Sequence, residues 1–186
     1  MKRSAISKLG GLEPRQFDLY QQRQQLPFEM EEGRKDYSLT EAVMLHCFVD
    51  LVGSGLRTAE ASAFILNGIK RVERGAFAEH DGKNICLRSP RPLFDSWDDE
   101  IWIAREVWTA DYAEKFEDGR DFSVTWWGGT KEEVFSEVAF RNTAETAQKR
   151  ETLSIQLYSL SKARGKVFDA ARALELDELA EVEGAR

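Results

Sequence analysis

The sequence predicts an α+β protein of two modules: a helical amino-terminal module with a small wing, and a carboxy-terminal module with a mostly antiparallel sheet and a final helix. Apolar residues recur at helical spacing through the first module, whereas they alternate with polar residues in several segments of the second. All five tryptophans lie between Trp97 and Trp127, and residues 1–75 contain none. We therefore expect one domain over residues 1–75 and another over residues 76–186.

The composition excludes several classes of protein. Of the 186 residues, 42% are apolar and 32% are charged, which allows a buried core and excludes a disordered or fibrous chain. The longest apolar stretches are too short for a membrane-spanning helix, and the first residues lack the apolar run of a secretory signal. Two cysteines, Cys47 and Cys86, cannot form a disulfide framework or a four-thiolate zinc site. We expect a cytoplasmic protein without a membrane partner.

The charge is distributed unevenly along the chain. The net charge is −7, but residues 1–75 carry 11 Lys and Arg against 10 Asp and Glu, whereas residues 76–186 carry 15 against 23. The first 24 residues hold five basic and two acidic residues. A locally basic end on an acidic protein is compatible with contact to phosphate groups through that end.

Two short helices are predicted at the start of the chain. Ile6 and Leu9 are three residues apart, as on one face of a helix, and the glycines at 10–11 end that helix. Pro14 suits the first position of a second helix, because its fixed φ and missing N–H cost nothing there. The second helix should end before Pro27, since the residue before a proline avoids the α region.

A wing and two further helices complete the first module. Residues 28–37 are too short for a buried layer and predict a small hairpin. Ser38 and Glu41 form a capping box that starts the third helix, and residues 53–55, rich in glycine, end it. Thr58 can cap a fourth helix.

The second module contains several segments of strand character. These are residues 83–88, 101–108 and 122–126, together with the clean alternation of Leu153, Ile155 and Leu157. Residues 130–133 form a second capping box that would start a helix, although residues 134–140 also fit a strand.

The segment after residue 152 has two interpretations. It fits a strand followed by a helix from Ser161, or one helix from Thr152 whose heptad pattern would form a dimeric coiled coil. We favour a strand and then a helix, because Ser154, Tyr158 and Ser159 are poor helix formers.

The order helix, glycine turn, helix, wing, helix, glycine turn, helix resembles the DNA-binding domain of the MerR-type winged helix-turn-helix regulators, over about residues 4–72. The residues that carry the resemblance are 5–12 at the end of the first helix and its turn, 14–17 and Tyr20 of the recognition helix, Lys35 and Tyr37 of the wing, and 55–56 between the last two helices.

The resemblance implies a homodimeric transcriptional regulator whose second helix enters the major groove of double-stranded DNA. The residues that it places at the DNA are Lys8, Arg15, Gln16, Tyr20, Gln21, Arg34, Lys35 and Tyr37. A module of almost neutral charge should bind weakly alone, which is why two copies are expected. Asp18 and the acidic residues beside the wing indicate an alternative, a protein-interaction module that keeps the helix-turn-helix shape without binding DNA.

The tryptophans of the second module suggest a possible pocket for an apolar or cationic small molecule. Its candidate residues are Trp97, Trp102, Trp108, Trp126 and Trp127. The same rings could instead form a sheet core or a subunit interface, where aromatic side chains are common. In a regulator, the second module would dimerise the protein or bind a small-molecule or protein effector. A further alternative is that the protein is a small-molecule-binding protein that uses the tryptophan-rich module. The sequence contains no pattern typical of a catalytic nucleophile, a phosphate loop or a metal site, so we expect no enzyme activity, cofactor or metal.

Overall fold

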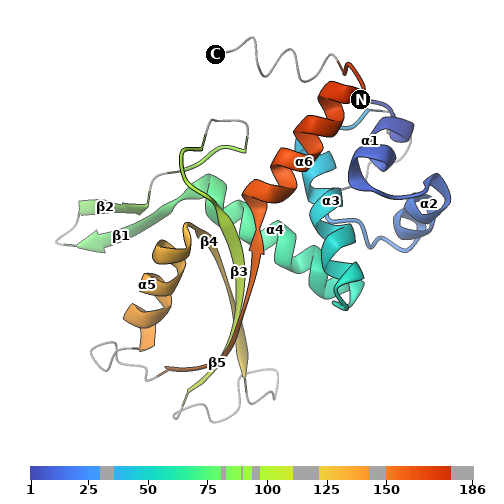
Figure 1. The fold of residues 1–186 in the computed structure, drawn as a ribbon. Coiled ribbons are helices and arrows are strands. Elements are labelled where there is room, and N and C mark those ends of the chain that lie inside the picture. The colour runs from blue at the N-terminus through green and yellow to red at the C-terminus, as the bar shows by residue number, and fades with distance from the viewer. Residues whose placement is uncertain are drawn as a thin grey trace. The chain divides into compact units, whose positions relative to one another are not determined.

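The computed structural model describes residues 1–29, 36–80, 83–88, 90–93, 97–110, 122–142 and 150–176. Within these ranges the elements are α1 (Arg3–Gly10), α2 (Pro14–Gln22), α3 (Leu39–Gly53), α4 (Thr58–Arg74), β1 (Ala76–His80), β2 (Lys83–Arg88), β3 (Trp102–Ala110), β4 (Ser123–Gly129), α5 (Lys131–Asn142), β5 (Arg150–Ser159) and α6 (Leu160–Ala173) (Figure 1). The mixed helix and sheet content and the antiparallel sheet confirm the predicted α+β class.

The chain divides into two compact units. The helical unit comprises Met1–Leu66 together with Leu160–Arg186, and the sheet unit comprises Asn67–Ser159. This division differs from the boundary expected after residue 75 in two ways: α4 continues from one unit into the other, and α6 belongs with the amino-terminal helices. The second difference arises because the buried face of α6 packs against α1 and α3.

The start of each helix follows from local chemistry. Pro14 occupies the first turn of α2 after a capping box between Glu13 and Gln16. In the capping box of α3, the Ser38 backbone N–H donates to the Glu41 carboxylate at 2.8 Å, and the Glu41 backbone N–H donates to Ser38 Oγ at 3.2 Å. Gly11 ends α1 in the left-handed conformation, with φ of +73°. α2 ends at Gln22, earlier than the expected stop before Pro27.

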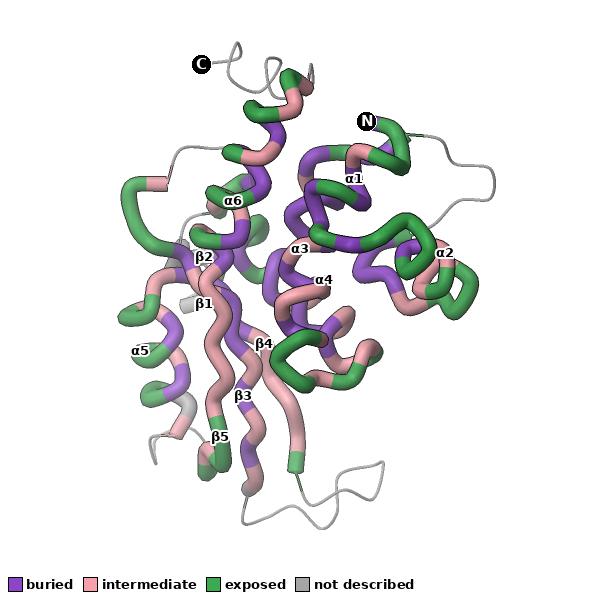
Figure 2. Tube along the Cα trace, turned by 45° about the vertical axis from the view of Figure 1, so that its right-hand side comes forward, coloured by how far each residue is buried: buried purple, intermediate pink, exposed green. Residues whose placement is uncertain are grey.

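Aliphatic and aromatic side chains together form the core of the helical unit. Buried residues run along most of α3, which is largely purple in Figure 2. Phe17 of α2 is fully buried and meets Tyr37 edge to face, with ring centroids 5.7 Å apart. Tyr20, on the same side of α2, meets Phe48 of α3 in the same way at 5.1 Å. These contacts fix the inner face of α2 against the rest of the unit.

The sheet unit is built on three antiparallel strands in the order β4-β3-β5. α5 packs on one face of this sheet, where Ala104, Trp127, Val134 and Val138 form a buried cluster. The carboxy-terminal part of α4 approaches the strands closely, since a Cβ atom built on Gly128 would lie 2.6 Å from Val72. A separate antiparallel hairpin, β1–β2, was not fully predicted from the sequence, because only its second strand has a clear pattern.

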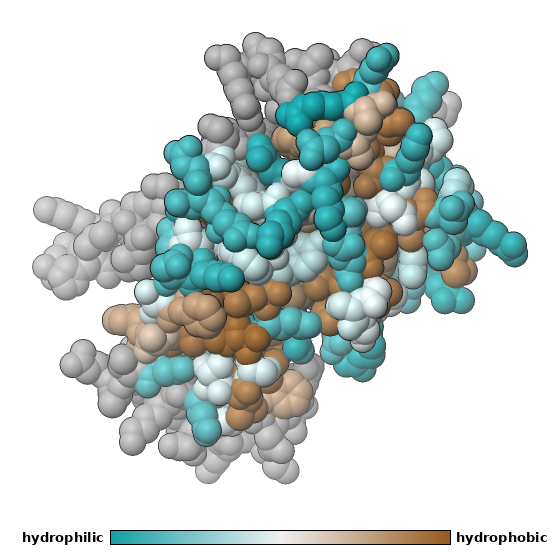
Figure 3. Space-filling view, viewed as in Figure 1, coloured by the Kyte–Doolittle hydropathy of each residue, from teal (hydrophilic) through white to brown (hydrophobic). Residues whose placement is uncertain are grey.

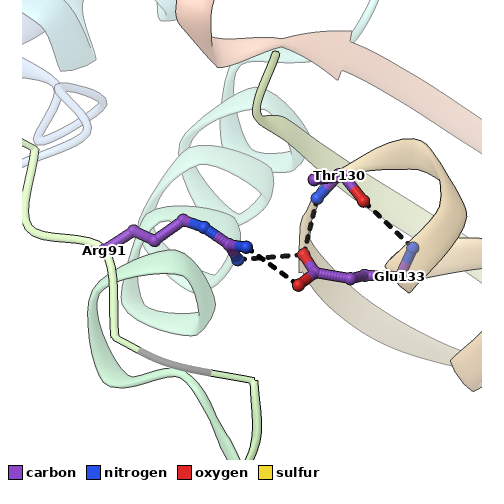
Figure 4. Close-up of polar contacts among 3 residues, drawn as sticks. All are labelled: Arg91, Thr130 and Glu133. Atoms are coloured by element: carbon purple, nitrogen blue, oxygen red, sulfur yellow. Dashed lines mark hydrogen bonds and ion pairs between the residues drawn. The ribbon is translucent and has the colours of Figure 1, made fainter. Parts of the chain in front are cut away.

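The start of α5 is tied to the segment that precedes β3. Arg91 donates two hydrogen bonds to the Glu133 carboxylate, each 2.9 Å long (Figure 4). The same carboxylate accepts from the backbone N–H of Thr130 at 2.8 Å, and Thr130 Oγ1 accepts from the Glu133 backbone N–H at 3.2 Å. The predicted capping box is thus confirmed, and residues 134–140 form a helix rather than a strand.

The alternation predicted for β5 is wrong at Leu153. The pairing of β5 with β3 steps from Ser154 opposite Val107 to Thr152 opposite Trp108, so Leu153 is the extra residue of a β-bulge. Its side chain is 54% exposed instead of sharing the buried face of Ile155 and Leu157. β5 is followed at once by α6, so the interpretation as a strand and then a helix is confirmed and the coiled-coil alternative is wrong.

No helix among the described residues is both long enough and apolar enough to cross a membrane.

Candidate nucleic-acid interface

The candidate interface is the outer face of α2. Arg15, Leu19 and Gln22 are exposed and follow one another at spacings of four and three residues, so they form one stripe along the helix. A surface hollow beside this stripe is lined by Glu13, Arg15, Gln16, Asp18, Leu19 and Gln22. The end of the helical unit that carries α2 is largely hydrophilic, shown in teal in Figure 3. The outer face of α2 is therefore polar, apart from Leu19.

The polar residues predicted at the DNA occupy different positions on this surface. Arg15 is exposed on the stripe, and Lys8 is exposed in the last turn of α1. Gln16 is exposed too, but its side-chain oxygen accepts the Glu13 backbone N–H at 3.3 Å and so helps to cap α2. Gln21 is half-buried and so less accessible than Arg15 or Gln16. Arg15 and Lys8 are thus the predicted residues best placed to meet a nucleic acid.

The negative charge of Asp18 is compensated by a residue that sequence reasoning missed. Arg3 of α1 forms an ion pair with Asp18, and the two side chains are 44% and 43% exposed. The Arg3 guanidinium also lies over the Phe17 ring, 5.6 Å from its centroid. Arg3 and Asp18 belong to different helices, and no local sequence pattern signals their pairing. Because the two charges offset each other, Asp18 does not make this face of α2 anionic.

The two predicted tyrosines belong mainly to the core. Tyr37 is 4% exposed and lies between Phe17 and Phe28, with ring centroids 5.7 and 6.2 Å away. We therefore correct its predicted contact with DNA: its ring supports α2 from inside. Tyr20 is half-buried against Phe48. The predicted wing residues Arg34 and Lys35 lie outside the described residues.

A half-buried histidine, His46, lies in α3 of the same unit. The Nε2 atom of His46 is 3.7 Å from Asp50, and Lys166 of α6 reaches the same carboxylate at 3.8 Å. Burial lowers the pKa of His46 from its ordinary value of 6.5, and the Asp50 carboxylate raises it only in part. The neutral imidazole is therefore favoured in the folded protein.

We expect this histidine to make the protein less stable in acid. The unfolded chain protonates His46 near pH 6.5, whereas the folded chain resists protonation, so stability is complete above pH 6.5 and falls as the pH drops toward the folded pKa. Chemical denaturation at several pH values, followed by far-UV circular dichroism, measures the effect. His46→Gln should lose this part of the pH dependence. An unchanged pH profile in that variant would assign the effect to another group.

The five tryptophans do not surround one cavity. Trp126 and Trp127 pair with Arg105 and Ala104 of β3 and so point to opposite faces of the sheet. Trp127 is 2% exposed, and its Nε1–H donates to the Glu106 carboxylate at 2.9 Å. Glu106, which is fully buried, also accepts the Thr152 hydroxyl at 2.6 Å. Trp127 is therefore a core residue with a satisfied hydrogen bond.

The remaining tryptophans are divided among separate surroundings. The Nε1–H groups of Trp108 and Trp97 donate to Thr125 Oγ1 at 2.8 Å and to the Pro92 carbonyl at 3.1 Å. The Lys131 ammonium lies 4.1 Å from the centroid of Trp102. A hollow beside Trp102 has a volume of about 160 Å³, below the ~300 Å³ at which small-molecule sites begin. These rings give the sheet unit a core and a few surface contacts rather than one aromatic pocket.

Sequence reasoning missed Leu19 and Gln22 as members of the outer stripe. The signal was present, because the inward pair Phe17 and Tyr20 fixes which positions of α2 face outward.

No known family model and no curated protein sequence matches this chain.

Proposed function

We propose that this protein is a sequence-specific transcriptional regulator that binds double-stranded DNA through α2, in the manner of the MerR-type regulators that its first module resembles. The observation that carries the proposal is α2 itself, a short helix with a polar outer stripe and an aromatic anchor behind it. A helix fits the major groove of B-DNA, where Arg bonds guanine and Gln bonds adenine in bidentate fashion. Arg15 and Gln22 supply these two chemistries.

The connection between α1 and α2 supports the proposal. The turn spans residues 11–13 and begins at Gly11 in the left-handed conformation, as short helix-turn-helix connections often do. Lys8, in the last turn of α1, stands at the side of the turn and is exposed. α2 then serves as the recognition helix, and Lys8 contacts a phosphate that sets its position along the groove.

The charge of the interface supports a dimer. Across α1, the cap residue Glu13 and α2, the positive charges of Arg3, Lys8 and Arg15 exceed the negative charges of Glu13 and Asp18 by one, a small positive excess. Few neutralised phosphates give weak binding, so two copies on two half-sites supply the affinity. The sheet unit dimerises the protein or senses an effector. The alternative of an interaction module without DNA binding depended on Asp18, whose charge Arg3 offsets, and on the acidic residues beside the wing, of which Glu31 and Glu32 lie outside the described residues.

The proposal is tested by selecting bound duplexes from a random DNA pool with the full chain and measuring their affinity against salt concentration. We expect specific duplexes to be enriched, with an affinity that falls as salt rises. Lys8→Ala should weaken binding to all duplexes alike and reduce the salt slope by about 1 for each half-site, because one phosphate contact is lost.

A matched variant controls for the loss of a positive charge as such. Arg57 is 83% exposed, lies outside α1 and α2, and pairs with Glu60 at 2.6 Å. Arg57→Ala should leave the affinity and its salt slope unchanged. The proposed function would be contradicted if no duplex were enriched, or if the affinity did not change with salt concentration.

A further inference from the structure

We infer that Leu19 determines part of the DNA specificity by contacting a thymine methyl group in the major groove, beside the guanine that Arg15 binds. This inference rests on the proposed function and adds the chemistry of the recognised bases. Leu19 is 42% exposed and lies on the outer stripe of α2 between Arg15 and Gln22. It is thus the apolar member of an otherwise polar stripe.

A single exposed leucine needs no explanation by itself, because folded proteins expose many apolar atoms. Leu19 is of interest because it lies between Arg15 and Gln22 on the outer stripe of α2. The three side chains of the stripe match three different features of base edges: Arg matches guanine O6 and N7, Leu matches the thymine C5-methyl group, and Gln matches adenine N6 and N7. A leucine pressed against a purely polar edge would instead leave donors or acceptors without partners.

The spacing of the stripe suits neighbouring base pairs. A helix rises about 1.5 Å per residue, so Leu19 stands about 6 Å along the axis from Arg15 and about 4.5 Å from Gln22. Base pairs are stacked about 3.4 Å apart, so successive members of the stripe reach base pairs that are one or two steps apart. We therefore expect each half-site to contain a guanine, a thymine and an adenine within a few base pairs.

The interior packing holds Leu19 in the outward position. Phe17 is fully buried and Tyr20 packs on Phe48, so the residues on both sides of Leu19 fix the rotation of α2. Asp18, the adjacent charged residue, is bound to Arg3. The negative charge of Asp18, the residue before Leu19, is therefore offset by Arg3 within the protein.

The test replaces thymines of a selected duplex by uracil, one position per half-site at a time. Uracil lacks only the C5-methyl group, so base pairing and polar edges are kept. For the wild-type protein, fluorescence anisotropy should show a loss of affinity of about fourfold per half-site at one thymine position, the factor expected for burying one methyl group. Leu19→Ala should bind the thymine and uracil duplexes equally.

Leu153→Ala controls for the removal of an exposed leucine, since Leu153 is 54% exposed in the sheet unit. This variant should keep the wild-type discrimination between thymine and uracil. Equal binding of thymine and uracil by the wild type at every position, or discrimination that persists in Leu19→Ala, would overturn the inference while leaving the proposed function intact. Failure to bind any duplex would overturn the proposed function and this inference together.

Discussion

Phe17→Ala should destabilise the helical unit by about 3–5 kcal/mol and abolish specific DNA binding. Phe17 is fully buried, meets Tyr37 edge to face at 5.7 Å, and lies under the Arg3 guanidinium at 5.6 Å. Its removal opens a cavity behind α2 and releases this proposed recognition helix from its support. Chemical denaturation followed by far-UV circular dichroism measures the loss of stability.

Two controls separate this effect from a general sensitivity to substitution. Phe17→Leu keeps most of the apolar volume and should cost much less than the alanine variant. Phe135→Ala removes a ring that is 46% exposed on α5, and it should change stability by no more than about 0.5 kcal/mol. A Phe17→Ala protein as stable as the wild type would show that α2 is not anchored as described.

Arg15→Ala should weaken binding to the selected duplex by about 1–3 kcal/mol for each half-site, or roughly 5- to 150-fold, and relax the preference for guanine at one position. The expected cause is the loss of the proposed bidentate contact to guanine, together with one positive charge. Because Arg15 is exposed on the outer stripe, the free energy of unfolding should stay the same. Selection from the random pool with the variant measures both affinity and preference.

Arg15→Lys is the matched control for charge. Lysine keeps the positive charge but loses the planar fork of the guanidinium. This variant should regain part of the non-specific affinity without the guanine preference. Wild-type affinity and specificity in Arg15→Ala would remove Arg15 from the interface.

The starts of the helices were predictable because their signals are local. Pro14 brings no N–H group to a helix start, where the first N–H groups lack partners within the helix. The capping boxes at Ser38–Glu41 and at residues 130–133 satisfy backbone groups within one turn. The same holds for Gly11, which ends α1 with a positive φ.

The features that escaped prediction depend on partners far away in the sequence. The bulge at Leu153 is set by the register of β5 against β3, which the alternation of apolar residues does not specify. Tyr37 matches the aromatic residue of the wing in the family that the first module resembles, but its ring packs against Phe17 and Phe28. The pairing of Arg3 with Asp18 joins two helices and changes the electrostatics of the candidate site.

The central claim, that α2 enters the major groove, is tested most directly by methylation protection. Dimethyl sulfate methylates guanine at N7, which lies in the major groove, so a bound side chain blocks the reaction. With the full chain on a selected duplex, we expect one guanine per half-site to be protected, and that guanine alone to regain reactivity in Arg15→Ala at a concentration that saturates the duplex. Tight binding with every guanine N7 still reactive, or protection that is identical in Arg15→Ala, would contradict the account.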